Sequence, residues 1–330
     1  MHRFRRLVVR LVQVLLLLLV IALGAALVLP LPGGPGVAAS SLAGPGDRFL
    51  DLDGTATRIT EDGPSDGPAV VLVHGFGGSV YSWRFTRTAL AQAGYHVLAL
   101  DLRGFGLSVK ALDADYSHGA QARLVLEAMD AAGMRSAVLV GHSMGGNVVA
   151  HAAQLAPDRV RALVLVDAAI VQPASGASPV ATAGSALLQV PPVRRIVQFG
   201  MRLALGGGTL ESMLRSAYAD PAFPTDADVA AYGTAQQVAD WDLALVGIVR
   251  DAGRNALEQS VASLGDGRPV LVAWGERDPW IPLATGEALR DAIPGAQWLE
   301  IAGAGHLPME EGRAAFEQGL LAFLGALPRP

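Results

Sequence analysis

The sequence predicts an α/β protein with a mostly parallel eight-stranded sheet, helices on both faces, a helical cap insertion and one preceding transmembrane helix. Three observations predict this fold. Short apolar segments alternate with helix-length segments through most of the chain. One interval between two apolar segments is about a hundred residues long, against the ~30 of an ordinary βαβ unit. A long uncharged apolar run stands near the N-terminus.

The apolar run Leu11–Leu29 predicts the transmembrane helix. It contains no charge and one polar side chain, Gln13, and its 19 residues would span about 28 Å as a helix. Because the next basic residue after the run is Arg48, the positive-inside bias puts the N-terminus in the cytoplasm and the remainder outside. The basic residues ahead of the run are Arg3, Arg5, Arg6 and Arg10.

A cleaved signal peptide followed by secretion is the alternative, since Val37-Ala38-Ala39 forms a small-residue cleavage site. The run is longer than the ~7–15 residues of a signal h-region, which favours a retained anchor. Residues 31–46 lack charge and are rich in glycine and proline, which predicts a flexible linker. The expected division is anchor or signal segment 1–30, linker 31–46, core 47–169, cap 170–245 and second core part 246–330.

The sheet is predicted to open with an antiparallel pair. Arg48–Asp51 and Thr55–Thr60 flank Asp53-Gly54, a sequence that favours a type I′ hairpin turn. Six further apolar segments have strand length and are separated by helix-length stretches, which indicates parallel βαβ connections. They are Ala69–Val73, Tyr95–Leu100, Ala137–Val140, Leu163–Val166, Val270–Trp274 and Gln297–Ile301.

The long interval after Val166 predicts a helical cap over the carboxyl edge of the sheet. Its segments Val180–Val190 and Ile196–Leu205 are mostly aliphatic and would either line a pocket or pack the cap. Leu243–Leu264 predicts the crossover helix that returns to the sheet. No internal repeat is found in the sequence.

Composition excludes several classes of protein. The net charge is −5, and from residue 11 onward 21 basic residues stand against 30 acidic ones, so nucleic acid is not an expected partner. There is no cysteine, which rules out a disulfide framework, a zinc-thiolate site and a thiol nucleophile.

The motif Gly141-His142-Ser143-Met144-Gly145 stands between a predicted strand and a predicted helix from about Met144 to Leu155. A serine on such a tight turn needs neighbours without side chains, and the turn exposes its hydroxyl. The helix that begins after Ser143 offers free N–H groups and a positive dipole end to an oxyanion. Ser143 is therefore the candidate nucleophile, and the N–H of Met144 is a candidate oxyanion donor.

The second candidate donor is the N–H of Phe76, in the segment His74-Gly75-Phe76-Gly77-Gly78-Ser79 directly after a predicted strand. Its glycines let the loop come close to the serine and aim a backbone N–H at a substrate oxygen. His74 itself is expected to hold the loop by hydrogen bonds.

A nucleophilic serine needs a base, and His306 is the candidate among seven histidines because it follows a late strand on the loop Gly303-Ala304-Gly305. The acid that orients it is predicted to be Asp278, with Asp167 as the alternative. Asp101 is expected to brace its own loop. Apart from His74 on its glycine loop, the remaining histidines lie before the anchor, within strands or helices, or beside the serine; they are His2, His96, His118, His142 and His151.

Taken together, these motifs resemble the α/β-hydrolase superfamily over nearly all of residues 48–326. The resemblance rests on HGFGGS at 74–79, DLRGFGLS at 101–108, GHSMGG at 141–146, WGERD at 274–278 and GAGH at 303–306, in the family's order of serine, acid and histidine. It implies that the cap shapes the substrate pocket. It also implies architectural roles for Asp101, Arg103, Gly104, Gly106 and Ser108.

The resemblance favours the serine esterase branch, close to monoacylglycerol lipases, because the nucleophile position holds Ser143 where dehalogenases and epoxide hydrolases carry aspartate. The expected activity is cleavage of carboxylic esters, of uncharged acyl or lipid type, through an acyl-enzyme and without a metal or organic cofactor. Carbon–carbon bond hydrolases and cofactor-free haloperoxidase-like enzymes share the triad and remain alternatives. A non-catalytic lipid-binding protein is the alternative outside enzymes.

Overall fold

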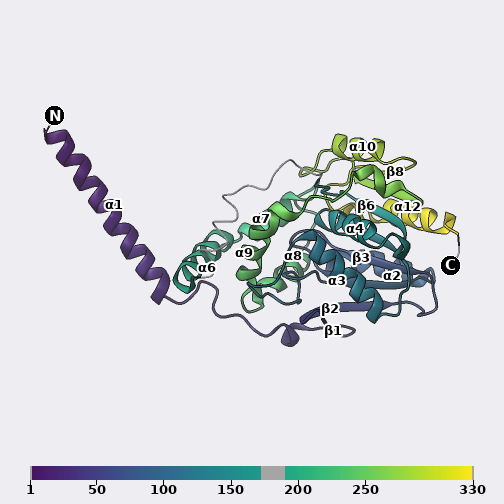
Figure 1. The fold of residues 1–330 in the computed structure, drawn as a ribbon, viewed down its shortest axis with the longest axis horizontal. Coiled ribbons are helices and arrows are strands. Elements are labelled where there is room, and N and C mark those ends of the chain that lie inside the picture. Colours follow the sequence, from purple (N-terminus) through teal and green to yellow (C-terminus); the bar gives the residue numbers. More distant parts are fainter. Residues whose placement is uncertain (1, 172–189, 329–330) are drawn as a thin grey trace.

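The computed structural model describes residues 2–171 and 190–328 (Figure 1). Its eight-stranded sheet has the order β1-β2-β4-β3-β5-β6-β7-β8; the pairs β1–β2 and β2–β4 are antiparallel and the other pairs are parallel. The predicted eight-stranded, mostly parallel fold is confirmed. The strands are β1 Arg48–Leu52, β2 Thr55–Asp62, β3 Ala69–Val73, β4 His96–Leu100, β5 Ala137–His142, β6 Val160–Val166, β7 Val270–Gly275 and β8 Gln297–Ile301.

The predicted hairpin joins β1 to β2. Both turn residues have positive φ, 48° at Asp53 and 66° at Gly54, as a type I′ turn requires. The four central strands consist almost wholly of valine, leucine and alanine and are buried on both faces. That composition explains why they read as continuous apolar runs in the sequence.

Helices cover both faces of the sheet. Residues of α3, α4 and α10 belong to the apolar cluster on one face, and residues of α2 and α12 belong to the cluster on the other. The two clusters leave the sheet with no open apolar face among the described residues. These helices span α2 Arg84–Gln92, α3 His118–Ala131, α4 Met144–Leu155, α10 Leu283–Ala292 and α12 Arg313–Ala326, with the short α11 at Pro308–Glu311.

The register of the sheet brings several strand ends to one edge. Gly141 at the end of β5 lies opposite Val73, the last residue of β3, and His142 lies opposite Val166, the last residue of β6. Val166 is in turn opposite Ala273 of β7. The loops that follow β3, β5, β6 and β7 therefore start side by side.

The cap lies between β6 and β7 in sequence and contains α6, α7, α8 and α9 among the described residues. The segment Leu243–Leu264 is not one crossover helix: α9 ends at Asp251, and 3₁₀ turns at Ala252–Arg254 and Val261–Gly265 follow. Part of the predicted aliphatic run Val180–Val190 falls outside the described residues, which resume at Val190. The cap helices span α6 Pro191–Leu205, α7 Thr209–Ser216, α8 Asp226–Gly233 and α9 Trp241–Asp251.

The N-terminal helix α1, His2–Val28, extends away from the body of the molecule and contacts α6 of the cap (Figure 1). Within it, Val9–Val28 is long and apolar enough to cross a membrane, a property shared by signal sequences. Most described side chains between residues 9 and 25 are exposed. This helix therefore has the length, composition and exposure that the sequence predicts for an anchor or a signal segment.

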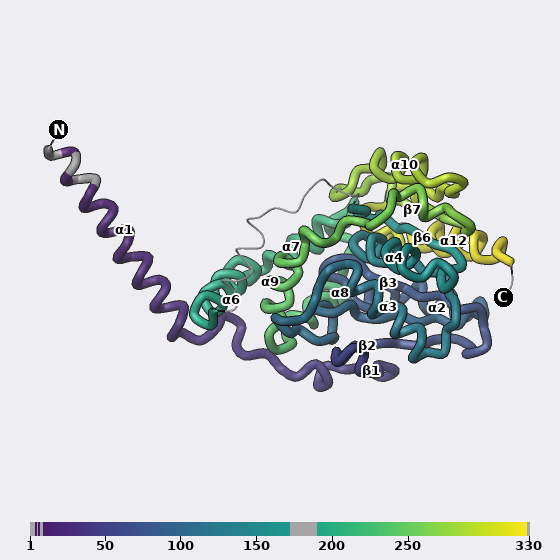
Figure 2. The backbone as a smooth tube through the Cα atoms, viewed as in Figure 1, coloured from purple at the N-terminus to yellow at the C-terminus, as the bar shows by residue number. Residues whose placement is uncertain are grey.

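The linker after α1 makes hydrogen bonds to the cap. Val37 pairs with Val238 of the cap: its N–H donates to the carbonyl of Gln237, and its own carbonyl accepts from Ala239. Arg202 of α6 donates to the carbonyl of Gly34. Backbone pairing, which composition does not reveal, thus attaches this segment to the cap before it enters β1 (Figure 2).

Candidate active site

Ser143 stands on the turn between β5 and α4 in a strained backbone conformation, with φ 51° and ψ −119°. A Cβ on Gly141 would lie 2.4 Å from the carbonyl oxygen of Gly145, and a Cβ on Gly145 would lie 2.4 Å from that of Val73. Both glycines are therefore required by close backbone approach. The turn has the tight strand-to-helix geometry that the sequence predicts for a nucleophilic serine.

Three side chains from different loops form one hydrogen-bonded chain. Oγ of Ser143 lies 3.0 Å from Nε2 of His306, and Nδ1 of His306 lies 2.7 Å from Oδ2 of Asp278. All three residues are at least nine-tenths buried. The structure thus brings together the serine, the histidine and the preferred acid that the sequence predicts.

Asp278 is held as an anion that faces the imidazole. Its Oδ1 accepts hydrogen bonds from the backbone N–H groups of Trp280 and Ile281, at 2.7 and 2.9 Å. Burial by itself would raise the pKa of Asp278, but its hydrogen bond and charge interaction with His306, together with the Ile281 N–H, bring that pKa below its ordinary value. The carboxylate can therefore keep Nδ1 of His306 protonated and leave Nε2 as the proton acceptor.

The loop that carries His306 is supported from two sides. Its backbone N–H donates to the carbonyl of Ala217, just after α7 of the cap, and its carbonyl accepts from Nε2 of His142 at 2.6 Å. Burial followed by the nearby His306 lowers the pKa of His142 to about 3, so the His142 ring is neutral. This support by His142 is not expected from the sequence, whose only signal is its place beside the serine.

The loop after β3 approaches the serine as its glycines predict. A Cβ on Gly75 would lie 2.9 Å from Cβ of Ser143, so only glycine fits there. His74 has the expected structural role: Nδ1 bonds to the carbonyl of Gly75, and Nε2 accepts from the N–H of Leu102. Burial lowers the pKa of His74, which keeps its ring neutral.

The two candidate oxyanion donors belong to the loop and the helix that meet at the serine. Met144 is the first residue of α4, where a helix leaves its N–H groups without intrahelical partners. For the N–H of Phe76, no backbone acceptor is found among the described residues. Both groups are thus available to a developing negative charge.

The other acids have separate roles. Asp101 accepts from the N–H groups of Val80 and Leu107 and so braces its own loop, as predicted. Glu276 is exposed and accepts from the N–H of Gly303. Asp167, the alternative acid, makes no hydrogen bond to His306 in the described part of the chain and instead accepts from the N–H of Gly275.

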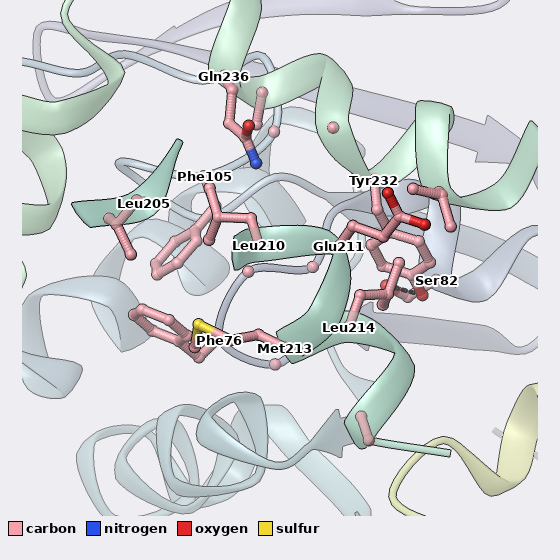
Figure 3. A pocket seen from close by; sticks show the side chains of 18 of the residues that line it. Phe76, Ser82, Phe105, Leu205, Leu210, Glu211, Met213, Leu214, Tyr232 and Gln236 are labelled. Carbon is pink, nitrogen blue, oxygen red and sulfur yellow. Dashed lines mark hydrogen bonds between the residues drawn. The ribbon is translucent and has the colours of Figure 1, made fainter. Parts of the chain in front are cut away.

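A cavity of about 360 Å³ opens beside His306, between the sheet edge and the cap. Its walls are mostly apolar, as Figure 3 shows for the side chains that gather around it. Helix α7 supplies much of the cap wall, whereas the predicted run Ile196–Leu205 contributes only Leu205. The apolar wall residues labelled in Figure 3 are Phe76, Phe105, Leu205, Leu210, Met213 and Leu214.

Two adjacent carboxylates of α11 fasten the cap to the core beside this cavity. Glu310 accepts from the hydroxyls of Tyr218 and Tyr232 and pairs with Arg84. Glu311 accepts from the N–H of Ala219 in the cap and from the N–H of Gly305, next to His306. Because one acidic pair holds both the cap and the histidine loop, their positions are coupled.

Comparison with known proteins agrees with this architecture. Residues 68–313 match the family described as alpha/beta hydrolase fold. The chain is 32% identical over 280 residues to the dihydrolipoyllysine-residue acetyltransferase component of the acetoin cleaving system of Cupriavidus necator, covering 84% of this chain and 69% of that protein. It is 32% identical over 261 residues to Lipase 3 of Moraxella sp., covering 74% and 73%.

Among solved structures, a membrane phospholipase A described as a bacterial virulence factor matches with a TM-score of 0.66 and 27% identity, covering 96% of this chain and 98% of that one. The family match extends over most of the described core and includes the serine turn and the histidine loop. The chain belongs to the alpha/beta-hydrolase fold family.

Proposed function

We propose that this chain is a membrane-anchored serine hydrolase that cleaves carboxylic esters of uncharged acyl groups or lipids. The observation that carries the proposal is the continuous hydrogen-bonded chain from Ser143 through His306 to Asp278, whose central residue, His306, lines an apolar cavity. Relatives described as lipases and the membrane phospholipase A support the same class of substrate.

In the proposed reaction, His306 accepts the proton of the Ser143 hydroxyl through Nε2 while Oγ attacks the ester carbonyl carbon. The N–H groups of Phe76 and Met144 stabilise the oxyanion. His306 then returns the proton to the departing alcohol, which leaves an acyl-enzyme. Attack by water, again with His306 as base, releases the acid and restores Ser143.

The cavity accounts for the proposed preference for apolar acyl groups. Among its described lining residues, the lysine and acidic side chains are those of Lys110 and Glu211. The ammonium of Lys110 is already occupied by the carbonyls of Phe105, Gly106 and Ser108. Each methylene buried against the apolar walls would contribute about 0.8 kcal/mol of binding.

We expect kcat/KM for p-nitrophenyl esters to rise several-fold from acetate to octanoate. Met213→Trp, which fills the cavity from α7, should abolish this rise and leave acetate hydrolysis nearly unchanged. Leu203→Trp is the matched control, because Leu203 is 62% exposed on α6 and lies outside the lining. Rates that fall steadily from acetate to octanoate would contradict the substrate class and favour small esters or carbon–carbon bonds.

The membrane anchor is tested by fractionation. We expect the full chain to stay with membranes after high-salt and carbonate washing, because burying Val9–Val28 in lipid is favourable for an apolar helix of this length. A chain that begins at Leu31 should be released by the same washes while retaining the Val37 pairing with the cap. Recovery of a mature protein that begins near Ser40 in the soluble fraction would instead support the signal-peptide alternative.

A further inference from the structure

Asp167 is a fully buried carboxylic acid that the proposed mechanism does not use. It follows directly after β6, with 0% exposure and a φ of 41°, a conformation that side-chain-bearing residues rarely adopt. Its Oδ1 accepts from the N–H of Gly275. Its Oδ2 is buried and finds no hydrogen-bond donor among the described residues. A buried carboxylate oxygen without a hydrogen-bond donor destabilises the folded protein, whereas a protonated oxygen can itself act as a donor.

Two other titratable side chains, those of Asp278 and His306, lie close to Asp167. One oxygen of Asp167, one oxygen of Asp278 and one ring nitrogen of His306 lie within 4.8 Å of one another. In the described part of the chain these are the titratable groups that face Asp167; beyond them the His306 ring contacts that of His142, at 4.8 Å between centroids. Two carboxylates this close and this buried cannot both be ionised without strong repulsion.

Of the two carboxyl groups, that of Asp167 has the surroundings that favour the neutral form. Asp278 accepts two backbone N–H donors and faces His306, all of which favour its anionic form. Asp167 has one backbone donor and no cation beside it among the described residues. Burial, and then the charge of Asp278, raise the pKa of Asp167 well above its ordinary value, in agreement with this assignment.

We propose that Asp167 is a positioning residue for the proposed reaction: as a neutral acid it donates a hydrogen bond from Oδ2–H to the carboxylate of Asp278 and keeps that carboxylate aligned on His306. This inference rests on the proposed function.

The first test is the pH profile of Asp167→Asn. An amide keeps both contacts, since its oxygen can accept from Gly275 and its NH₂ can donate to Asp278. We expect kcat/KM for an ester within about 3-fold of the native protein, and an unchanged midpoint for its acidic limb. If Asp167 were ionised, removing its charge would lower that midpoint by about one pH unit, which would overturn the proposal.

The second test removes the donor. Asp167→Gly tolerates the positive φ but cannot donate, so we expect kcat to fall by about 10-fold or more with little change in KM, because Asp167 does not line the cavity. In an Asp278→Asn background the same change should cost less than about 2-fold, because Asp167 acts through Asp278. Equal losses in both backgrounds, at matched unfolding temperatures, would contradict the proposal. If Asp167→Gly does not fold, the asparagine profile still decides.

Two controls distinguish a neutral acid at Asp167 from a bound cation and from failure of the serine mechanism. Activity of the native protein should not change on treatment with a chelator; a loss restored by a divalent cation would mean that a cation satisfies Oδ2, and would overturn the proposal. Failure of the proposed function is recognised separately, because ester hydrolysis that survives Ser143→Ala disproves the serine mechanism whatever Asp167 does.

Discussion

Ser143→Ala is expected to reduce ester hydrolysis by at least roughly 10⁴-fold, because it removes the hydroxyl oxygen that His306 is positioned to activate. The fold should be unaffected, since the serine hydroxyl bonds only to His306 in the described part of the chain. The measurements are kcat/KM for p-nitrophenyl butyrate and the unfolding temperature of both proteins.

Labelling by a fluorophosphonate probe provides an independent readout of the same prediction. Native protein should be labelled at Ser143, and the alanine variant should not be labelled. Ser82→Ala is the matched control, because Ser82 lines the same cavity and bonds to Tyr232 rather than to an imidazole. Full hydrolysis by Ser143→Ala would end the proposed mechanism, and loss of labelling in Ser82→Ala would place the nucleophile elsewhere.

Asp278→Asn is expected to lower kcat by about 10³–10⁴-fold while the fold is retained. The two backbone donors Trp280 and Ile281 will hold the amide oxygen where Oδ1 now lies, which turns the amide NH₂ toward Nδ1 of His306. His306 must then carry its proton on Nε2 and can no longer accept one from Ser143.

The control for this substitution is Glu276→Gln, an exposed acid on the same loop whose hydrogen bond to Gly303 a glutamine can preserve. We expect that variant to keep kcat within about 2-fold of the native protein. A similar loss in both variants would show that the loop, rather than the Asp278 charge, matters. Near-native activity of Asp278→Asn would contradict this prediction and would indicate that Asp167 is the acid that orients His306.

Local sequence patterns were sufficient for the sheet and for the serine turn. Strands that are buried on both faces must be apolar throughout, so β3, β5 and β6 can be predicted from their valine-rich sequences. The hairpin turn at Asp53-Gly54 and the serine turn can also be predicted, because only a few residue types tolerate positive φ or close backbone approach. Each of these signals depends on neighbours in the chain.

The cap was less predictable, because its structure depends on contacts between distant segments. The aliphatic run Ile196–Leu205 mostly does not reach the cavity, and α7, which supplies the wall, has no distinguishing sequence signal. The linker pairs with Val238 through backbone groups, which every residue type carries. Composition therefore carries no signal for this pairing.

The sequence by itself determined the fold class and the serine turn, because strand ends and glycine loops mark the carboxyl edge of a parallel sheet. It predicted His306 as the base and left Asp278 and Asp167 as the two candidate acids. Only the tertiary structure decided between two acids on neighbouring strands. Asp167 and Asp278 both lie close to His306, and their backbone donors, not their sequence context, distinguish the acid that faces the imidazole from the acid that we propose to be neutral. The charge state of two buried carboxyl groups depends on desolvation and on hydrogen-bond donors from other segments of the chain, and local sequence predicts neither.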